Sequence, residues 1–177
     1  MPADIKDVLY SAINEIGRDR IRTDIAAGIK MSEEYCTHIM TKCSGRLGHK
    51  ADDETLATLC EALLHFMLTA SLLPSERKVV THGVDLDIVI PSMRVLGKNP
   101  EKSLVIQMVR GDRTTKAGQA ESVQPHRENI WLVSTRQLQT DHRNYHLGSG
   151  GFSYPRIILD INAFLSEKGD RGLKLLH

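Results

Sequence analysis

The sequence is poor in cysteine and in aromatic residues. It holds three cysteines, Cys36, Cys43 and Cys60, with no Cys-x-x-Cys pair, and aromatic residues make up 5% of the chain. An odd number of scattered cysteines predicts no disulfide framework, so we expect a reduced, cytoplasmic protein. A zinc site formed by Cys36 and Cys43 with His38 and His49 is the alternative, although this spacing matches no common zinc finger.

Net charge and long apolar runs are lacking too. The formal net charge is +1 at pH 7, so a nucleic-acid site would have to come from a local patch rather than from a general field. No apolar run is long enough to span a bilayer and the N-terminus has no signal-peptide pattern, so we expect no membrane partner. Hydrophobic residues still make up 41% of the 177 residues, which is enough for the core of one medium domain or two small ones.

Apolar residues recur at helical spacing through the first 50 residues. The pattern predicts a helix over residues 4–16, a second over residues 23–29 and a third over residues 32–45. Gly17 would end the first helix. We expect residues 1–50 to form a tri-helical module, and residues 51–177 to form a second unit.

Residues 24–39 resemble a helix-turn-helix. Six of them match its pattern of apolar and small positions: Ile25, Ala26, Met31, Ser32, Cys36 and Ile39. Ala26 is expected to be small because the third helix would cross close to it. Lys30 stands where the turn usually has Gly, so the resemblance implies a left-handed Lys at a cost of about 1 kcal/mol.

The helix-turn-helix resemblance implies that the third helix enters a major groove of DNA. The predicted nucleic-acid contacts are Arg22, Thr37, His38, Thr41, Lys42 and Arg46. A tri-helical module that dimerises or binds another protein is the alternative, and a homodimer remains open.

Residues 51–177 predict an α/β fold with a mixed sheet and flanking helices. A long helix is expected over residues 52–73, because its apolar stripe runs up to Pro74. A mobile loop, or a loop with a short helix, is expected over 111–127, and a helix over 137–144. The expected strands are 78–82, 84–90, 103–110, 130–134 and 156–161.

The strand over residues 84–90 carries the most informative motif. Strict alternation predicts that Asp85 and Asp87 project to one face, about 6–7 Å apart. The other face takes the apolar residues Leu86, Ile88 and Ile90. Two carboxylates on one face need a cation, a basic partner, water or a shared proton. A divalent metal is one reading, and a Lys or Arg partner with a solvated second aspartate is the other.

The order of these elements resembles the restriction-endonuclease-like, or PD-(D/E)XK, nuclease core. In that family an Asp on the second strand and an acid-x-Lys on the third bind Mg²⁺ and position a water, and a Glu of the first helix often completes the site. The resemblance implies Asp85 or Asp87 as the strand-two ligand, Gln107 in the acidic place and Glu61 on the helix. The implied metal ligands are Asp85, Asp87 and Gln107.

This sequence departs from the nuclease pattern on the third strand. Val109 stands where the family has Lys, and Val cannot stabilise charge on an attacking hydroxide. Lys102 or Arg110 would have to reach in from the strand ends. An Asp-x-Asp strand also resembles nucleotidyltransferase-like domains, but the Gly-Ser turn expected upstream is absent.

The function expected from these patterns is that of a DNA-associated protein. It would be a Mg²⁺-dependent endonuclease with a degenerate motif, or a non-enzymatic DNA-binding transcriptional regulator whose α/β domain dimerises or senses a ligand.

Overall fold

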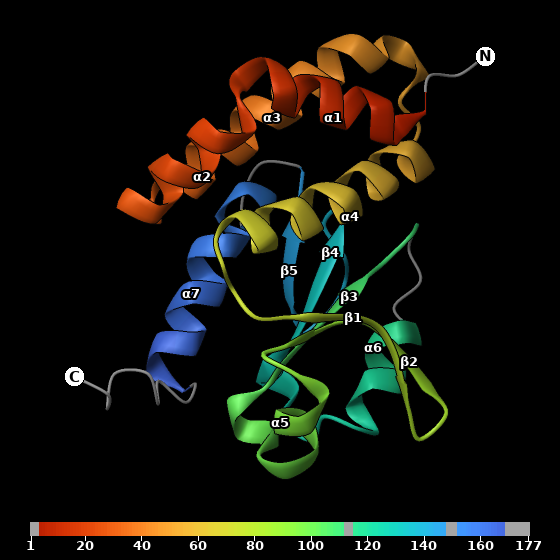
Figure 1. Ribbon diagram of the computed structural model, residues 1–177. Coiled ribbons are helices and arrows are strands. Elements are labelled where there is room, and N and C mark those ends of the chain that lie inside the picture. The colour runs from red at the N-terminus through yellow and green to blue at the C-terminus, as the bar shows by residue number, and fades with distance from the viewer. Residues whose placement is uncertain (1–3, 112–114, 148–151, 169–177) are drawn as a thin grey trace.

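The computed structural model describes residues 4–111, 115–147 and 152–168 (Figure 1). The helices are α1 Ile5–Ile16, α2 Arg18–Ala27, α3 Met31–Leu47, α4 Asp53–Ala70, α5 Met93–Lys98, α6 Thr115–Glu121 and α7 Ile157–Glu167. The strands are β1 Glu76–Thr81, β2 Val84–Ile90, β3 Leu104–Met108, β4 Ile130–Ser134, β5 Arg143–His146 and β6 Phe152–Ser153. Short 3-10 turns lie at η1 Gly48–Lys50, η2 Pro100–Lys102, η3 Arg127–Asn129 and η4 Tyr154–Arg156.

The strands form one mixed six-stranded sheet in the order β1-β2-β3-β4-β5-β6. β1, β2 and β3 pair in antiparallel fashion, and β3, β4, β5 and β6 run parallel to one another. The parallel strands are buried on both faces, as expected for a sheet covered by helices on each side. This agrees with the predicted α/β class with a mixed sheet.

Hydrophobic side chains separate onto the two faces of the sheet. Alternate residues of β3 divide between the faces, with Ile106 and Met108 on one and Val105 and Val109 on the other. The first face carries α4 and α7 with α1, α2 and α3 outside them, and the second face carries α5 and α6 (Figure 1). The result is a layered molecule with unequal helical coverage. None of the described helices combines the length and the apolar composition that crossing a bilayer requires.

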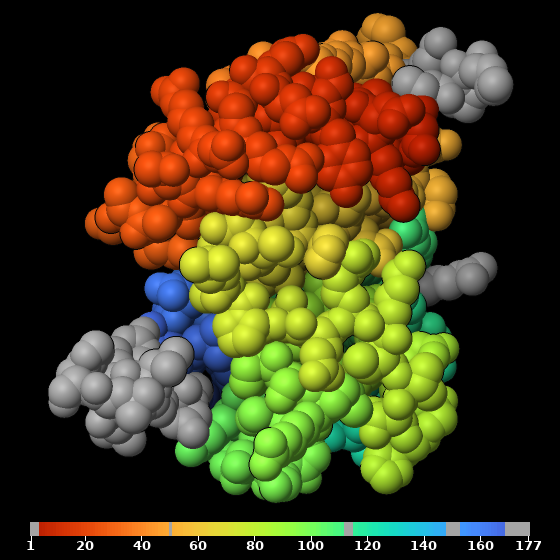
Figure 2. All heavy atoms as spheres, viewed as in Figure 1, coloured from red at the N-terminus to blue at the C-terminus, as the bar shows by residue number. Residues whose placement is uncertain are grey.

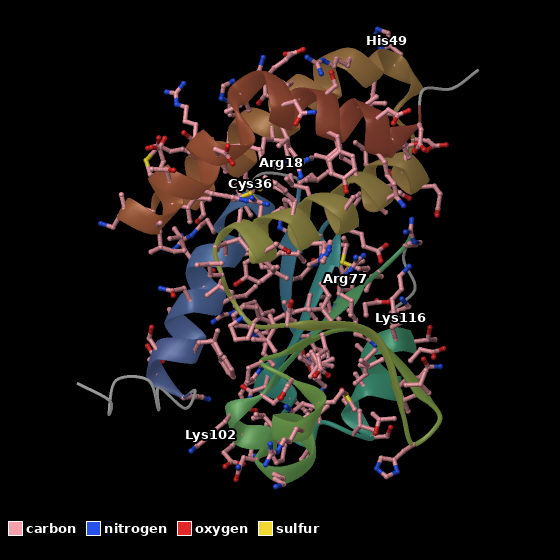
Figure 3. The ribbon with its side chains drawn as sticks, viewed as in Figure 1. Arg18, Cys36, His49, Arg77, Lys102 and Lys116 are labelled. Carbon is pink, nitrogen blue, oxygen red and sulfur yellow. The ribbon has the colours of Figure 1, made fainter. Side chains whose placement is uncertain are left out.

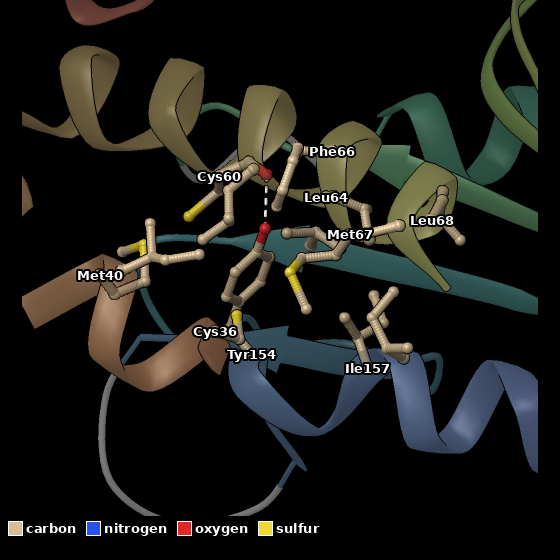
Figure 4. Packing of buried hydrophobic residues seen from close by; sticks show 14 of the residues in the cluster. Cys36, Met40, Cys60, Leu64, Phe66, Met67, Leu68, Tyr154 and Ile157 are labelled. Atoms are coloured by element: carbon tan, nitrogen blue, oxygen red, sulfur yellow. Dashed lines mark hydrogen bonds between the residues drawn. The ribbon is translucent and has the colours of Figure 1, made fainter. Parts of the chain in front are cut away.

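The first 50 residues share a core with the rest of the chain. α4 begins at an N-cap where the Asp52 side chain accepts a hydrogen bond from the Thr55 backbone N–H at 2.8 Å. The helix then packs against α1 and α3 on its outer side (Figure 2). Buried Cys36 of α3, Cys60 of α4 and Tyr154 lie together, and the Tyr154 hydroxyl donates to the Cys60 carbonyl at 2.5 Å (Figure 4). The predicted boundary at residue 50 falls between α3 and α4, and the division into two folding units stays a prediction.

Several local predictions about the N-terminal helices are wrong. α2 begins at Arg18 rather than near Thr23. Lys30 has φ −58° and ψ −26°, an ordinary helical conformation, so the turn before α3 carries no left-handed residue. Ala26 is exposed, so it is not small because α3 crosses over it. The helix-turn-helix therefore stays a prediction, and the close packing of the third helix on Ala26 that we expected is not observed.

Two predictions near the C-terminal end are also wrong. Residues 156–161, expected as a strand, belong mostly to α7. The buried residues of α7 are Ile157, Ile158, Ile161 and Phe164, which have helical spacing, and a run of β-branched residues hid this period. Residues 137–144 are expected as a helix, but 137–142 are irregular and Arg143 and Asn144 begin β5. The short helix expected within 111–127 is confirmed as α6.

Candidate functional site

The sheet opens between β2 and β3 at the predicted motif. Ladder pairing of these strands runs from Ile90 and Leu104 to Ile88 and Ile106 and goes no further. Two side chains bridge the strands beyond that point. Gln107 Oε1 accepts from the Asp87 backbone N–H at 2.8 Å, and Asp87 Oδ2 accepts from the Met108 backbone N–H at 2.8 Å. Side chains thus replace the backbone ladder where the two strands separate.

A bend in β2 accompanies this opening. Ile88 belongs to the core on the α4 face, whereas Leu86 packs with Val89 on the α6 face, so the predicted strict alternation fails at Asp87. On the neighbouring strand, pairing runs from Arg77–Ile88 to Val79–Leu86. Lys78 lies between those two pairs and has φ 51°. A left-handed residue in an edge strand produces such a local twist.

Lys116 supplies the cation beside Asp87. Its ammonium lies 2.7 Å from Asp87 Oδ2, and the two side chains are 40% and 19% exposed. α6 holds Lys116 in place because Ala117 and Ala120 pack into the core on that face of the sheet. Sequence reasoning missed Lys116, since it lies in a polar segment. The small pair Ala117 and Ala120, three residues apart, was the available signal for a helix that docks closely.

Gln107 is fully buried and both ends of its amide are engaged. Besides the bond from Asp87, its Nε2 donates to the Asp85 backbone carbonyl at 3.1 Å. Its oxygen therefore points between the strands rather than toward a shared ligand position. Val109 is buried on the α6 face and its backbone N–H bonds to the Val133 carbonyl. The third strand thus contributes packing and a polar bridge here, with no charge.

Glu61 of α4 lies in an ion-pair network with Arg77 and Arg110. Arg110 Nη2 lies 3.2 Å from Glu61 Oε2, Arg77 Nη2 lies 3.9 Å from Glu61 Oε1, and Arg110 Nη1 lies 2.7 Å from Glu54 Oε1. Burial, together with the nearby Arg77 charge, lowers the pKa of His65 in the same region. Among its described contacts Glu61 meets arginines, so the predicted convergence with Asp87 does not appear.

The side chains of two other predicted residues take no part in the strand gap. Lys102 lies in η2, just before β3 begins, whereas the gap lies where β3 ends, and Figure 3 places Lys102 well away from Lys116. Lys102 therefore cannot replace the missing strand-three Lys. Asp85 is exposed, and its backbone rather than its carboxylate is bonded to Gln107.

A cleft of about 1050 Å³ adjoins Lys116 at the end of β3. It is lined by Asp52, Asp53, Glu54, Met108, Arg110, Gly111, Thr115, Lys116 and Arg136. Three of these residues are basic and three are acidic, and Arg136 pairs with Asp53. The cleft is therefore polar and close to neutral, with cations contributed by three different segments of the chain.

The described side chains do not fit the predicted magnesium site. Within residues 4–111, 115–147 and 152–168, no group of three His, Cys, Asp or Glu side chains is placed to hold a metal ion. The Asp87 carboxylate already pairs with the Lys116 ammonium, and the Gln107 amide oxygen already accepts a hydrogen bond from the Asp87 backbone N–H. The zinc alternative finds no support either, because Cys36 is buried in the core and His49 lies beyond the end of α3 (Figure 3).

The residues predicted to contact DNA lie on the second and third helices. Arg22, Thr37, His38 and Thr41 are exposed. Lys42 and Arg46 both pair with Glu15 of α1, and together they hold the pKa of that carboxyl below its usual value. The leading part of α3 adjoins α7, since a shallow pocket there is lined by residues of α3 together with Leu159. Thr37, His38 and Thr41 form one exposed polar strip on α3, whereas Arg22 belongs to α2.

The described chain is thus a mixed α/β sheet that opens between β2 and β3 and carries helices on both faces. Neither a protein-family model nor a curated protein matches the sequence. Among solved structures, the chain is similar to the restriction endonuclease PspGI in complex with substrate DNA, with a TM-score of 0.59 and 14% identity over 92% of this chain and 93% of that one. It is also similar to metal-depleted Ecl18kI in complex with uncleaved, modified DNA, with a TM-score of 0.54 and 8% identity over 93% and 79%.

At these identities the similarity establishes the fold. Each match covers more than nine-tenths of this chain, so it takes in most of the first 50 residues. The predicted restriction-endonuclease-like fold is thereby confirmed at the level of architecture.

Proposed function

We propose that the protein binds DNA and that the cleft at the end of β3 receives the DNA backbone. The observation that carries this proposal is the meeting of Arg110, Lys116 and Arg136 beside the gap between β2 and β3. Side chains of this kind make most protein contacts to phosphate. The two restriction endonucleases of similar fold were solved in complexes with DNA, which supports the same class of ligand for this chain.

The ion pairs in the cleft are compatible with this proposal. Arg136 pairs with Asp53 while its side chain is 69% exposed and that of Asp53 is 40% exposed. An exposed pair of this type contributes only about 0–1 kcal/mol. Exchanging the carboxylate for a phosphate therefore costs little, and the guanidinium can serve either partner.

A finer proposal concerns α3. Thr37, His38 and Thr41 form an exposed strip that would meet a second segment of the duplex as a helix-turn-helix does. The hydroxyls of Thr37 and Thr41 already donate to the Glu33 and Thr37 carbonyls within the helix. They would therefore act on DNA as acceptors or through their methyl groups. A homodimer that presents two such strips remains part of this proposal.

A second candidate function is metal-dependent hydrolysis of the DNA backbone, favoured by the place of Asp87 in the strand gap. Asp87 and exposed Asp85 would be the carboxylates available to Mg²⁺, which takes oxygen ligands. When bound, such an ion would supply a polarised water. The described donor set does not complete this site, so no hydrolytic step is derived from it.

The binding proposal is tested with a labelled mixed-sequence duplex and fluorescence anisotropy across a salt series. Arg136→Gln is expected to weaken binding about three- to tenfold and to reduce the slope of log K against log salt by about 0.9, the value for one lost phosphate contact. Lys102→Gln is the matched control, because Lys102 is also exposed and basic but lies away from the cleft. Equal binding by both variants, or no duplex binding by the wild type, would contradict the proposal.

Hydrolysis is tested separately on supercoiled plasmid with Mg²⁺ or Mn²⁺. Nicking that disappears in Asp87→Asn would support the second candidate. Intact plasmid in the presence of confirmed binding would leave a DNA-binding protein that does not cut.

A further inference from the structure

We propose that the ammonium of Lys116 takes the place of a divalent cation at Asp87, so that DNA binds the cleft without metal. This inference rests on the proposed DNA-binding function and names the residue that would meet phosphate in the strand gap. Its starting point is the disagreement between the donor set and the magnesium site implied by the strand motif.

The charges in the strand gap already balance. Asp87 contributes one negative charge, Lys116 one positive charge, and Gln107 none. In a site with two or more carboxylates, a phosphate is repelled until a cation enters. Here the single half-buried carboxylate has its counter-ion within 2.7 Å, supplied by the chain itself. A divalent cation would have to displace the Lys116 ammonium to reach it.

Lys116 is placed to contact a second anion. An ammonium has three donor hydrogens, and the bond to Asp87 uses one of them. Lys116 lines the cleft and its side chain is 40% exposed, so the remaining donors face the space proposed for the DNA backbone. The buried Ala117 and Ala120 anchor α6, which keeps the ammonium at the end of β3.

The experiment measures duplex affinity by anisotropy with EDTA, with Mg²⁺ and with Ca²⁺, which supports metal-bridged contacts without hydrolysis. The wild type is expected to bind equally in all three. Lys116→Gln is expected to lose at least tenfold in EDTA and to regain affinity with Ca²⁺, because it leaves the Asp87 carboxylate without its counter-ion. Lys116→Gln combined with Asp87→Asn removes both charges and is expected to recover part of the affinity in EDTA.

Lys102→Gln and Lys116→Arg serve as controls, the first for loss of one distant positive charge and the second for retention of charge at the site. Both variants are expected to bind the duplex within about threefold of the wild type, with or without metal, because both keep a positive charge beside Asp87. Circular dichroism checks that each variant is folded. If Lys116→Gln does not fold, the metal dependence of wild-type binding and of the wild-type Tm still decides the outcome.

Three results would overturn the inference. The wild type could need a divalent cation for binding, Lys116→Gln could bind as Lys102→Gln does, or the double variant could bind no better than Lys116→Gln in EDTA. Thermal unfolding is also measured without DNA, so that the inference about Lys116 can fail or hold independently of the proposed DNA binding. In that measurement millimolar Mn²⁺ is expected to leave the wild-type Tm unchanged and to raise the Tm of Lys116→Gln. A Mn²⁺-stabilised wild type would refute the replacement even if no DNA bound.

Discussion

Replacing Gln107 by Glu tests whether the strand gap is closed by the amide bridge. The substitution introduces, with almost no change of volume, the acidic residue that the nuclease pattern has at this place in the third strand. The new side chain can accept from the Asp87 N–H, as Gln107 Oε1 does at 2.8 Å. It can donate to the Asp85 carbonyl, as Gln107 Nε2 does at 3.1 Å, only while it is protonated.

The magnitude follows from burial. Gln107 is fully buried, and full burial raises the pKa of a carboxyl group by as much as about 3–5 pH units. A rise of about 2 to 3 pH units above the ordinary value of about 4.3 corresponds to about 3–4 kcal/mol at 1.36 kcal/mol per unit. Because the folded state then binds the proton more tightly than the unfolded state, stability falls as pH rises from about 4.3 to the raised value. Below that window the variant is expected to be nearly as stable as the wild type.

Urea unfolding of the wild type and of Gln107→Glu at about pH 5 and about pH 8 measures this effect. Gln107→Leu is the matched control, since it removes both hydrogen bonds without adding a titratable group. Its destabilisation is expected to be about 2–4 kcal/mol, because it leaves the Asp87 N–H and the Asp85 carbonyl without their partner, and to be the same at both pH values. If Gln107→Glu is as stable as the wild type at about pH 8, or is destabilised equally at both values, the amide does not lie locked between β2 and β3.

Three further predictions concern other contacts. Glu121 bonds to His142 Nε2 at 2.9 Å, and this contact together with Arg127 lowers the pKa of Glu121. Glu121→Gln is therefore expected to lower the Tm above about pH 4.5 and to have no effect as pH falls well below that value, which thermal melts across pH would show. Tyr154→Phe removes the buried bond to the Cys60 carbonyl and is expected to cost about 1 kcal/mol in urea unfolding; no change would mean that the hydroxyl contributes nothing. Removal of residues 1–50 is expected to abolish cooperative unfolding of the remainder, and a fragment that melts sharply would instead establish the two predicted units.

The sequence was sufficient to predict the elements whose apolar residues follow a clear strand or helix pattern. β2 and β3 were found because alternation and flanking breakers mark them, and α4 because a broad apolar stripe runs between an Asp cap and Pro74. The class of fold followed from the order of those elements. The end of the chain was misread because the three-residue apolar run Ile157–Leu159 is compatible with either period.

The candidate site was less predictable, because its partners are set by tertiary contacts. The sequence pointed to Asp85 or Asp87 as the strand-two ligand, and this role stays a prediction, although Asp87 is the carboxylate that lies in the strand gap. Val109, which stands where the nuclease pattern has Lys, is buried. The sequence could not show that Gln107 turns sideways into the gap, since that depends on where β2 and β3 separate. Nor could it show Lys116, which reaches Asp87 only because α6 docks on the second face of the sheet.

Whether the chain divides at residue 50 also depends on tertiary contacts. A helix that covers a sheet from outside needs one apolar stripe, but the buried residues of α4 include the adjacent pairs Leu59–Cys60 and Leu63–Leu64 and the triplet Phe66–Leu68. Adjacent residues on a helix point about 100° apart, so these clusters require cover on two sides. The sheet covers one side, and α1 and α3 cover the other. The width of the α4 stripe was thus the signal in the sequence that other helices cover the outer side of α4.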